Sequence, residues 1–191
     1  MYGRRRDFLL LRYNMKNSSK SAIGGIVAAL SLVLMISIAV VPFLTYALPA
    51  VAGVLLMFVV IEINKKWAFG VYATVAILGV LFVPDKEVAI MYLAFFGYYP
   101  IVKSVIESKL PHVPEWICKI LLFNATVAVA YLFMIKIMGL TIDEFDKYGM
   151  VAIPMLLGLG TFAFVFYDYA LSKLVLIYNM KFRKYFRRFF R

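Results

Sequence analysis

The chain has 191 residues, of which 64% are hydrophobic and only 16% are charged, and its mean hydropathy is +0.89. A water-soluble domain of this size cannot bury so large an apolar fraction in one core, so the composition excludes a soluble globular protein. Together with a formal net charge of +11, the composition indicates an integral membrane protein with basic segments outside the hydrocarbon layer.

The apolar residues fall into blocks of about 17 to 25 residues, the length that an α-helix needs to cross a bilayer. No strand-like alternation of apolar and polar residues accompanies them. The sequence therefore predicts an all-α, polytopic membrane fold with a basic segment at 1–20, a transmembrane domain at 21–171 and a basic, aromatic segment at 172–191. Its six transmembrane helices are expected at 21–41, 44–63, 67–83, 88–105, 117–138 and 150–171, the third being the shortest.

Basic residues are distributed unevenly between the two sides of these helices. Of the 21 Lys and Arg residues, 18 fall on the side of the N-terminus, and only Lys86, Lys136 and Lys147 fall on the other side. Because cytoplasmic loops carry an excess of Lys and Arg, we expect a multi-pass protein of the cell membrane with both termini in the cytoplasm.

The two ends of the chain combine cations with aromatic side chains. The last eleven residues read KFRKYFRRFFR, and the N-terminal MYGRRRDFLLLRY has the same character. Such segments are typical of helices that lie on anionic lipid of the cytoplasmic leaflet. Basic residues interleaved with aromatics also suit nucleic acid, but the topology alone requires these charges, so no nucleic-acid partner is predicted.

Groups for catalysis or metal binding are missing from the predicted helices. The single histidine, His112, lies in the proline-flanked segment LPHVPEW and is predicted to be a loop residue. No HExxH motif, no pair of carboxylates on one helix face and no GxxxxGK[ST] loop occurs. The sequence therefore predicts a protein that is not an enzyme, with no catalytic residue, no metal site and no cofactor.

Four charged residues, Glu62, Lys103, Lys119 and Asp168, fall near the predicted cytoplasmic ends of their helices. We interpret them as side chains that reach interfacial water and pair with one another. The alternative is a charge-paired surface that binds a cytoplasmic partner, with Lys103 and Glu107 among its contacts.

The fourth predicted helix contains AFFGYYPIVKSVIESK, in which Gly97 lacks side-chain bulk and Pro100 lacks a backbone donor. The helix is expected to bend there. Lys103 and Glu107 are four residues apart and share one helix face, in the weaker order for an ion pair. Deeper in the fifth helix, Asn124 and Thr126 are expected to form hydrogen bonds with a neighbouring helix.

A small ligand arriving from outside would meet the outer half of the helices. Tyr92 and Tyr131 could stack on such a ligand, and Lys136 is a cation on the side that the positive-inside rule disfavours. We therefore predict that these three residues bind the substrate, with Lys136 pairing with an anionic group.

The first helix carries a strip of small residues in SAIGGIVAALS, where Gly24 and Gly25 lie four residues before Ala28 and Ala29. Another helix can approach such a strip closely, within the protein or from a partner. With the chain length, the six helices and the basic lead, NSSKSAIGGIVAALSLVLM resembles the first helix of the substrate-binding, or S, components of energy-coupling-factor transporters.

This resemblance implies that the protein captures a vitamin or similar small nutrient from outside. The strip at Gly24, Gly25, Ala28 and Ala29 would dock on a transmembrane coupling subunit, and separate ATPases would supply the energy. The predicted outer loops are short, whereas in that family they help to cover the substrate. An alternative is therefore a non-catalytic membrane scaffold similar to the six-span rod-shape-determining proteins of bacteria. A small channel or permease is a third alternative.

Overall fold

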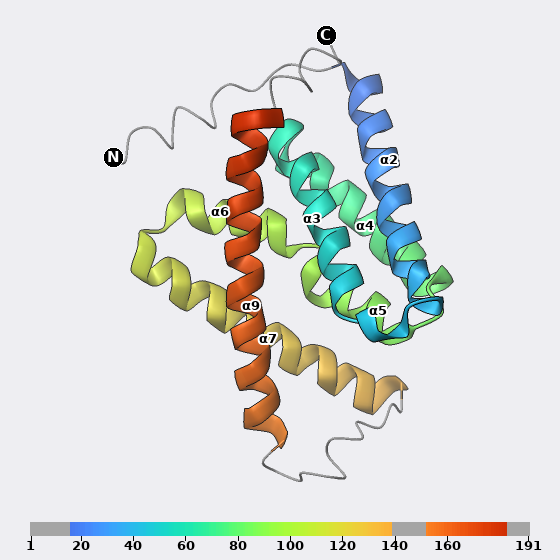
Figure 1. Cartoon of the computed structure of the whole chain (residues 1–191), viewed down its shortest axis with the longest axis vertical. Helices are drawn as coiled ribbons and strands as arrows, with labels where there is room; N and C mark the ends of the chain where they lie inside the picture. Colours follow the sequence, from blue (N-terminus) through green and yellow to red (C-terminus); the bar gives the residue numbers. More distant parts are fainter. Residues whose placement is uncertain (1–15, 139–151, 183–191) are drawn as a thin grey trace.

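The computed structural model describes residues 16–138 and 152–182, and Figure 1 shows their arrangement. Within these ranges the chain is helical and contains no strand, which confirms the all-α prediction. The helices are α2 (Asn17–Ile36), α3 (Ala47–Glu62), α4 (Lys65–Phe82), α5 (Lys86–Met91), α6 (Tyr99–Lys109), α7 (His112–Met138) and α9 (Ala152–Ile177). Short 3-10 turns, η1 (Ser37–Ala39) and η2 (Pro42–Leu44), follow α2, and π-helical turns form η3 (Tyr92–Phe96) and η5 (Tyr178–Phe182).

Five helical segments of the described part are long and apolar enough to cross a membrane. They are Asn17–Ala39, Lys65–Phe82, Lys86–Lys109, His112–Ala130 and Leu157–Lys181. The protein is therefore an all-α protein with several helices of membrane-spanning length. The second predicted span corresponds to α3, whose 16 residues make it shorter than these five segments, and the third predicted span corresponds to α4, which has 18. A sixth crossing by α3 and the cytoplasmic placement of both termini stay predictions.

Helix boundaries follow from local chemistry. The side chain of Asn64 accepts a hydrogen bond from the Trp67 N–H at 2.8 Å and so caps the start of α4.

The fifth predicted helix begins earlier than expected, because prolines are accommodated in a first helical turn, where no backbone donor is needed. His112 is accordingly the first residue of α7, and its prediction as a loop residue is wrong.

The first half of the chain packs as one group. α2, α3 and α4 run side by side, and α5 lies across their far end (Figure 1). Their shared core is made mostly of small and branched side chains, including Ile23, Ala52, Leu56, Val75 and Val88, together with Met35. Such residues allow close helix packing.

The fourth predicted helix is interrupted at the place where the sequence predicts a bend. The π-turn η3 closes with a hydrogen bond from the Gly97 N–H to the Tyr92 carbonyl at 2.8 Å, and α6 starts anew at Tyr99. Pro100 cannot donate to the carbonyl of Phe96. A side chain at Gly53 of α3 would collide with this carbonyl, so glycine is required where α3 passes the break.

The second half of the chain is organised around aromatic side chains. Phe95 of η3 packs against Tyr99, Phe123 and Phe164, which come from α6, α7 and α9. The rings of Phe123 and Phe164 stack with centroids 4.8 Å apart. This block brings α6, α7 and α9 together where they cross in Figure 1.

Candidate functional site

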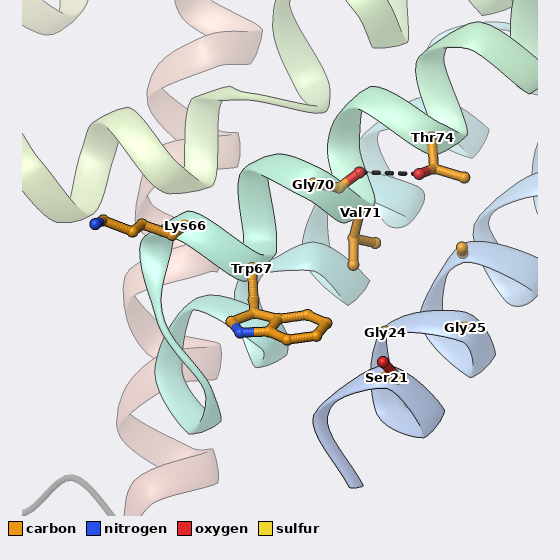
Figure 2. Close-up of a pocket in the computed structure, with 9 residues that line it drawn as sticks. Ser21, Gly24, Gly25, Lys66, Trp67, Gly70, Val71 and Thr74 are labelled. Atoms are coloured by element: carbon orange, nitrogen blue, oxygen red, sulfur yellow. Dashed lines mark hydrogen bonds between the residues drawn. The ribbon is translucent and has the colours of Figure 1, made fainter. Parts of the chain in front are cut away.

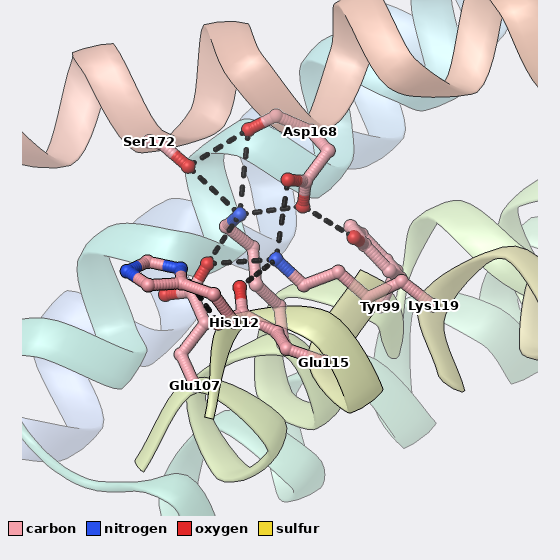
Figure 3. A network of polar contacts seen from close by, with 8 residues as sticks. Tyr99, Glu107, His112, Glu115, Lys119, Asp168 and Ser172 are labelled. Atoms are coloured by element: carbon pink, nitrogen blue, oxygen red, sulfur yellow. Dashed lines mark hydrogen bonds and ion pairs between the residues drawn. The ribbon is translucent and has the colours of Figure 1, made fainter. Parts of the chain in front are cut away.

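Beside the aromatic block lies a group of charged side chains that we call the charge cluster. It is shown in Figure 3 and consists of Lys103 and Glu107 on α6, Glu115 and Lys119 on α7, and Asp168 on α9. Residues spaced four apart on one helix share a face, so α6 and α7 each present one lysine and one glutamate to the cluster. Three helices thus converge on one set of charges.

The ammonium group of Lys103 joins α6 to α9. Its Nζ donates to Asp168 Oδ1 at 2.5 Å and to Ser172 Oγ at 2.9 Å, and it lies 2.7 Å from Glu107 Oε1. The Asp168 carbonyl oxygen lies 3.3 Å from the same Nζ, so four acceptors surround the three N–H donors of this lysine. The expected ion pair of Lys103 and Glu107 is therefore present, within a larger network.

Lys119 is the ammonium group that α7 contributes to the cluster, and it joins α7 to both α6 and α9. Its Nζ donates to Glu107 Oε1 at 2.9 Å, Glu115 Oε1 at 2.8 Å and Asp168 Oδ2 at 3.1 Å. It also lies 5.4 Å from the centre of the Trp116 ring, within the range of a cation–π contact. Lys119 therefore connects all three carboxylates of the cluster.

Asp168 is the centre of the network. Oδ1 accepts from Lys103 and from the Tyr99 hydroxyl, and Oδ2 accepts from Lys119. The ring of Tyr99 is itself part of the aromatic block, stacked on Phe95. The apolar rings keep water away from one side of the carboxylate, which strengthens each charge interaction there.

Apart from Glu107, the cluster is buried, which corrects the expectation that these residues reach interfacial water. Lys103, Lys119 and Asp168 are 0%, 1% and 2% exposed, and Glu62, at the end of α3, is also buried. Mutual pairing of Lys103, Lys119 and Asp168 is confirmed, whereas snorkelling is wrong for them. Because Lys103 is inaccessible, a partner would contact the cluster through Glu107, whose side chain is 35% exposed.

Comparisons of the chain with protein-family models, with curated proteins and with solved structures find no match. Functional conclusions therefore rest on the residues and their geometry.

The polar residues deeper in α7 also connect helices. Asn124 Nδ2 donates to Thr161 Oγ1 of α9 at 3.2 Å, and the hydroxyls of Thr126 and Tyr98 lie 2.7 Å apart. Both interhelical contacts predicted from the sequence are confirmed. Near Thr126, an apolar cavity of about 540 Å³ lies between α4, the α5–η3 segment and α7, with Val80, Leu93 and Val129 among its lining residues.

The predicted substrate residues are only partly described. Tyr92 lies in η3, is fully buried, and its ring stands 6.1 Å from that of Tyr72. The structure records no hydrogen-bond partner for the Tyr92 hydroxyl. Tyr131 and Lys136 belong to α7, but their side chains lie outside the described part of the structure. Substrate binding by these three residues stays a prediction.

The small-residue strip of α2 divides between two roles. A Cβ at Gly24 would lie 3.0 Å from Val71 of α4, so this glycine serves packing inside the protein. Gly25 has nothing within 4 Å of such an atom, and neither has Gly70 of α4. Both border a groove of about 440 Å³ between α2 and α4, which Ala28 also lines (Figure 2).

Sequence reasoning did not identify Glu115 as part of the site. It lies in the proline-flanked segment that was predicted to be a loop, yet it sits in the first turn of α7 and is 7% exposed. A signal was present, because Glu115 precedes Lys119 by four residues, the favourable order for a helical ion pair. Recognising it requires placing the start of α7 before Glu115.

Proposed function

We propose that the protein is a membrane-embedded transport subunit that binds a small nutrient such as a vitamin, like the S components that its sequence resembles. The observation that carries this proposal is the charge cluster, built between helices of membrane-spanning length. Ionisable groups inside such helices are energetically costly and mark substrate or ion pathways in transporters.

The broken fourth helix supports the same proposal. Discontinuous helices interrupted by glycine and proline form the binding sites of many transporters, and π-turns often occur at functional sites. Here the break at η3 lies directly beside the cluster, because Tyr99, the first residue of α6, donates to Asp168. A change in the geometry of the break would therefore move the Tyr99 hydroxyl, which donates a hydrogen bond to Asp168.

The groove between α2 and α4 is the proposed contact for a coupling subunit. Gly25 and Gly70 add no side chain to its lining, so another helix could approach closely at these two positions. In this proposal ATP hydrolysis belongs to separate cytoplasmic partners, and this chain supplies the substrate site.

A second candidate function is a membrane scaffold that holds other proteins. It is favoured by the charge cluster, since a fully paired network can equally hold α6, α7 and α9 in one arrangement. It is also favoured by the predominantly apolar lining of the cavity of about 540 Å³. In this case the groove between α2 and α4 and the apolar cavity would be contact surfaces for other proteins, and no nutrient would bind.

Purification from native membranes separates the two candidates. The full chain, extracted with its surrounding lipid, should retain a membrane subunit, two ATPase subunits and a small molecule that mass spectrometry identifies. Vesicles containing the complex should take up that molecule, and Asp168→Asn should reduce uptake at equal protein level. Recovery of cell-shape or division proteins without ATPases or a small molecule would favour the scaffold.

A further inference from the structure

The carboxylate of Glu107 stands between two ammonium groups. One of its oxygens, Oε1, lies 2.7 Å from Lys103 Nζ and 2.9 Å from Lys119 Nζ. We propose that Lys103 and Lys119 form a binding site for an oxyanion, a carboxylate or a phosphate, and that Glu107 fills this site as an internal ligand until an anion replaces it. Hydrogen bonds from ammonium groups to carboxylate or phosphate oxygens are stronger than those between neutral groups.

Glu107 is the carboxylate of the cluster that can leave. Its side chain is 35% exposed, whereas those of Glu115 and Asp168 are 10% and 3% exposed. It lies in the last turn of α6, and its order relative to Lys103 is the weaker one for a helical ion pair. A rotation of one side chain at a helix end would therefore move Glu107 into water without disturbing the other members.

The charges of the cluster favour this exchange. Its two ammonium groups face three carboxylates, and Glu115 and Asp168 alone balance both lysines. Glu107 is thus the charge in excess. When it leaves, buried Lys119 loses one of its three acceptors, and Lys103 loses a charged acceptor and keeps Asp168 Oδ1, Ser172 Oγ and the Asp168 carbonyl oxygen. This loss is unfavourable until another oxyanion arrives. An incoming oxyanion supplies that acceptor in the place where a carboxylate oxygen already fits.

The site has an accessible side. His112, at the start of α7, is 64% exposed, and its Nδ1 lies 3.8 Å from Glu115 Oε2. In Figure 3, His112 and Glu107 lie on one side of the Lys119 ammonium group and Asp168 lies on the other. An anion would approach from the side of His112, which the charge distribution of the sequence places at the cytoplasmic surface.

Two sources offer this chemistry, a free anion and the phosphate of an anionic lipid headgroup. The inference concerns the same cluster as the proposed transport function, but it is a statement about binding to the isolated chain. Its test therefore needs no transport assay, and failure of either idea leaves the other standing.

Trp116 provides a reporter, because its ring lies beside Lys119. The chain has two tryptophans, so Trp67→Phe isolates the emission of Trp116. The full chain with this change, in detergent, is titrated with sodium phosphate and, at equal ionic strength, with sodium chloride. Phosphate should change the emission with saturation and raise the melting temperature, and chloride should do neither. An equal response to both salts contradicts the proposal.

Removal of the internal ligand gives the sharper test. Glu107→Gln should bind phosphate at least about tenfold more tightly, because an open site no longer competes with its own carboxylate. Glu115→Gln removes the same charge from a buried position and serves as the matched control, for which a smaller increase is expected. Equal gains in both variants would reflect net charge alone and overturn the proposal. Should Glu107→Gln not fold, the Trp116 titration of the parent chain decides.

Lipid discs distinguish the two sources. If the ligand is a lipid headgroup, free phosphate should not change the Trp116 emission in discs of phosphatidylglycerol, because the lipid already fills the site. In discs of phosphatidylcholine, free phosphate should still change it. If the ligand is a free anion, both kinds of disc give the same response.

Discussion

Asp168 and Lys103, 65 positions apart in the chain, are joined by a contact of 2.5 Å between Oδ1 and Nζ in the interior of the protein. This contact ties α9 to the segment that follows the helix break, and it explains why two charges remain among apolar helices. A buried ion pair is a weak source of stability when compared with apolar side chains, but the loss of one partner is costly. The cluster is therefore an arrangement that the protein must keep complete.

Asp168→Asn should lower the free energy of unfolding by about 3 to 5 kcal/mol, since two buried lysines lose their shared carboxylate. Unfolding in detergent, followed by circular dichroism or by the melting temperature, measures the loss. The control is Asp85→Asn, at the residue that caps α5 by accepting from the Glu87 N–H. Asparagine caps a helix as well as aspartate, so this change should be nearly neutral. If the two variants lose comparable unfolding free energy, the carboxylate of Asp168 does not stabilise the protein through its two buried lysines.

Gly53→Ala should destabilise the protein by about 1 to 3 kcal/mol, because the added methyl group meets the Phe96 carbonyl and the Tyr167 hydroxyl. Gly70→Ala is the matched change at an open helical position, and it should be neutral or stabilising by up to about 1 kcal/mol. Melting temperatures of the two variants provide the comparison. A stable Gly53→Ala variant would mean that α3 passes the break at a greater distance.

The two glycines of α2 should respond differently to leucine. Gly24→Leu should lower the melting temperature, because its side chain would be forced against Val71. Gly25→Leu should fold normally, since its side chain enters the groove, but it should retain less of the coupling subunit in native purification. Unfolding of the isolated Gly25→Leu variant would show that the groove is closed by packing within this chain.

Cysteine labelling decides whether the short helix α3 crosses the membrane. Phe43 precedes α3 and is 84% exposed, and Lys66 follows it and is also exposed. In a chain whose native Cys118 is replaced by serine, Phe43→Cys should react with an impermeant maleimide added to intact cells. Lys66→Cys should react only after the membrane is opened. Labelling of both from the same side would show that α3 does not cross.

The fold was predictable where local chemistry decides it. Apolar blocks predict the helices, and the pair of Gly97 and Pro100 predicts the break, because one lacks bulk and the other lacks a donor. The start of α7 was not predicted correctly, since the prolines around His112 suit a loop and a first helical turn equally.

The site was less predictable than the fold. Its two local pairs, of which Lys103 with Glu107 is one, follow from a spacing of four residues. Their convergence on Asp168 depends on how α6, α7 and α9 cross, and this is decided by the aromatic packing of residues such as Phe95 and Phe164. Burial is likewise a property of that packing, so the sequence alone suggested side chains at the interface.

A double-mutant cycle on Lys103 and Asp168 tests most directly whether the buried cluster unites these helices. Unfolding free energies are measured for Lys103→Met, Asp168→Leu, the double variant and the parent chain under one condition. Each single change should lower the unfolding free energy strongly, because it leaves one buried charge without its partner. The loss in the double variant should be about 1 to 3 kcal/mol smaller than the sum of the two single losses, because both charges are removed together. Additivity of the two single effects to within about 0.5 kcal/mol would show that the residues do not interact and would contradict the account.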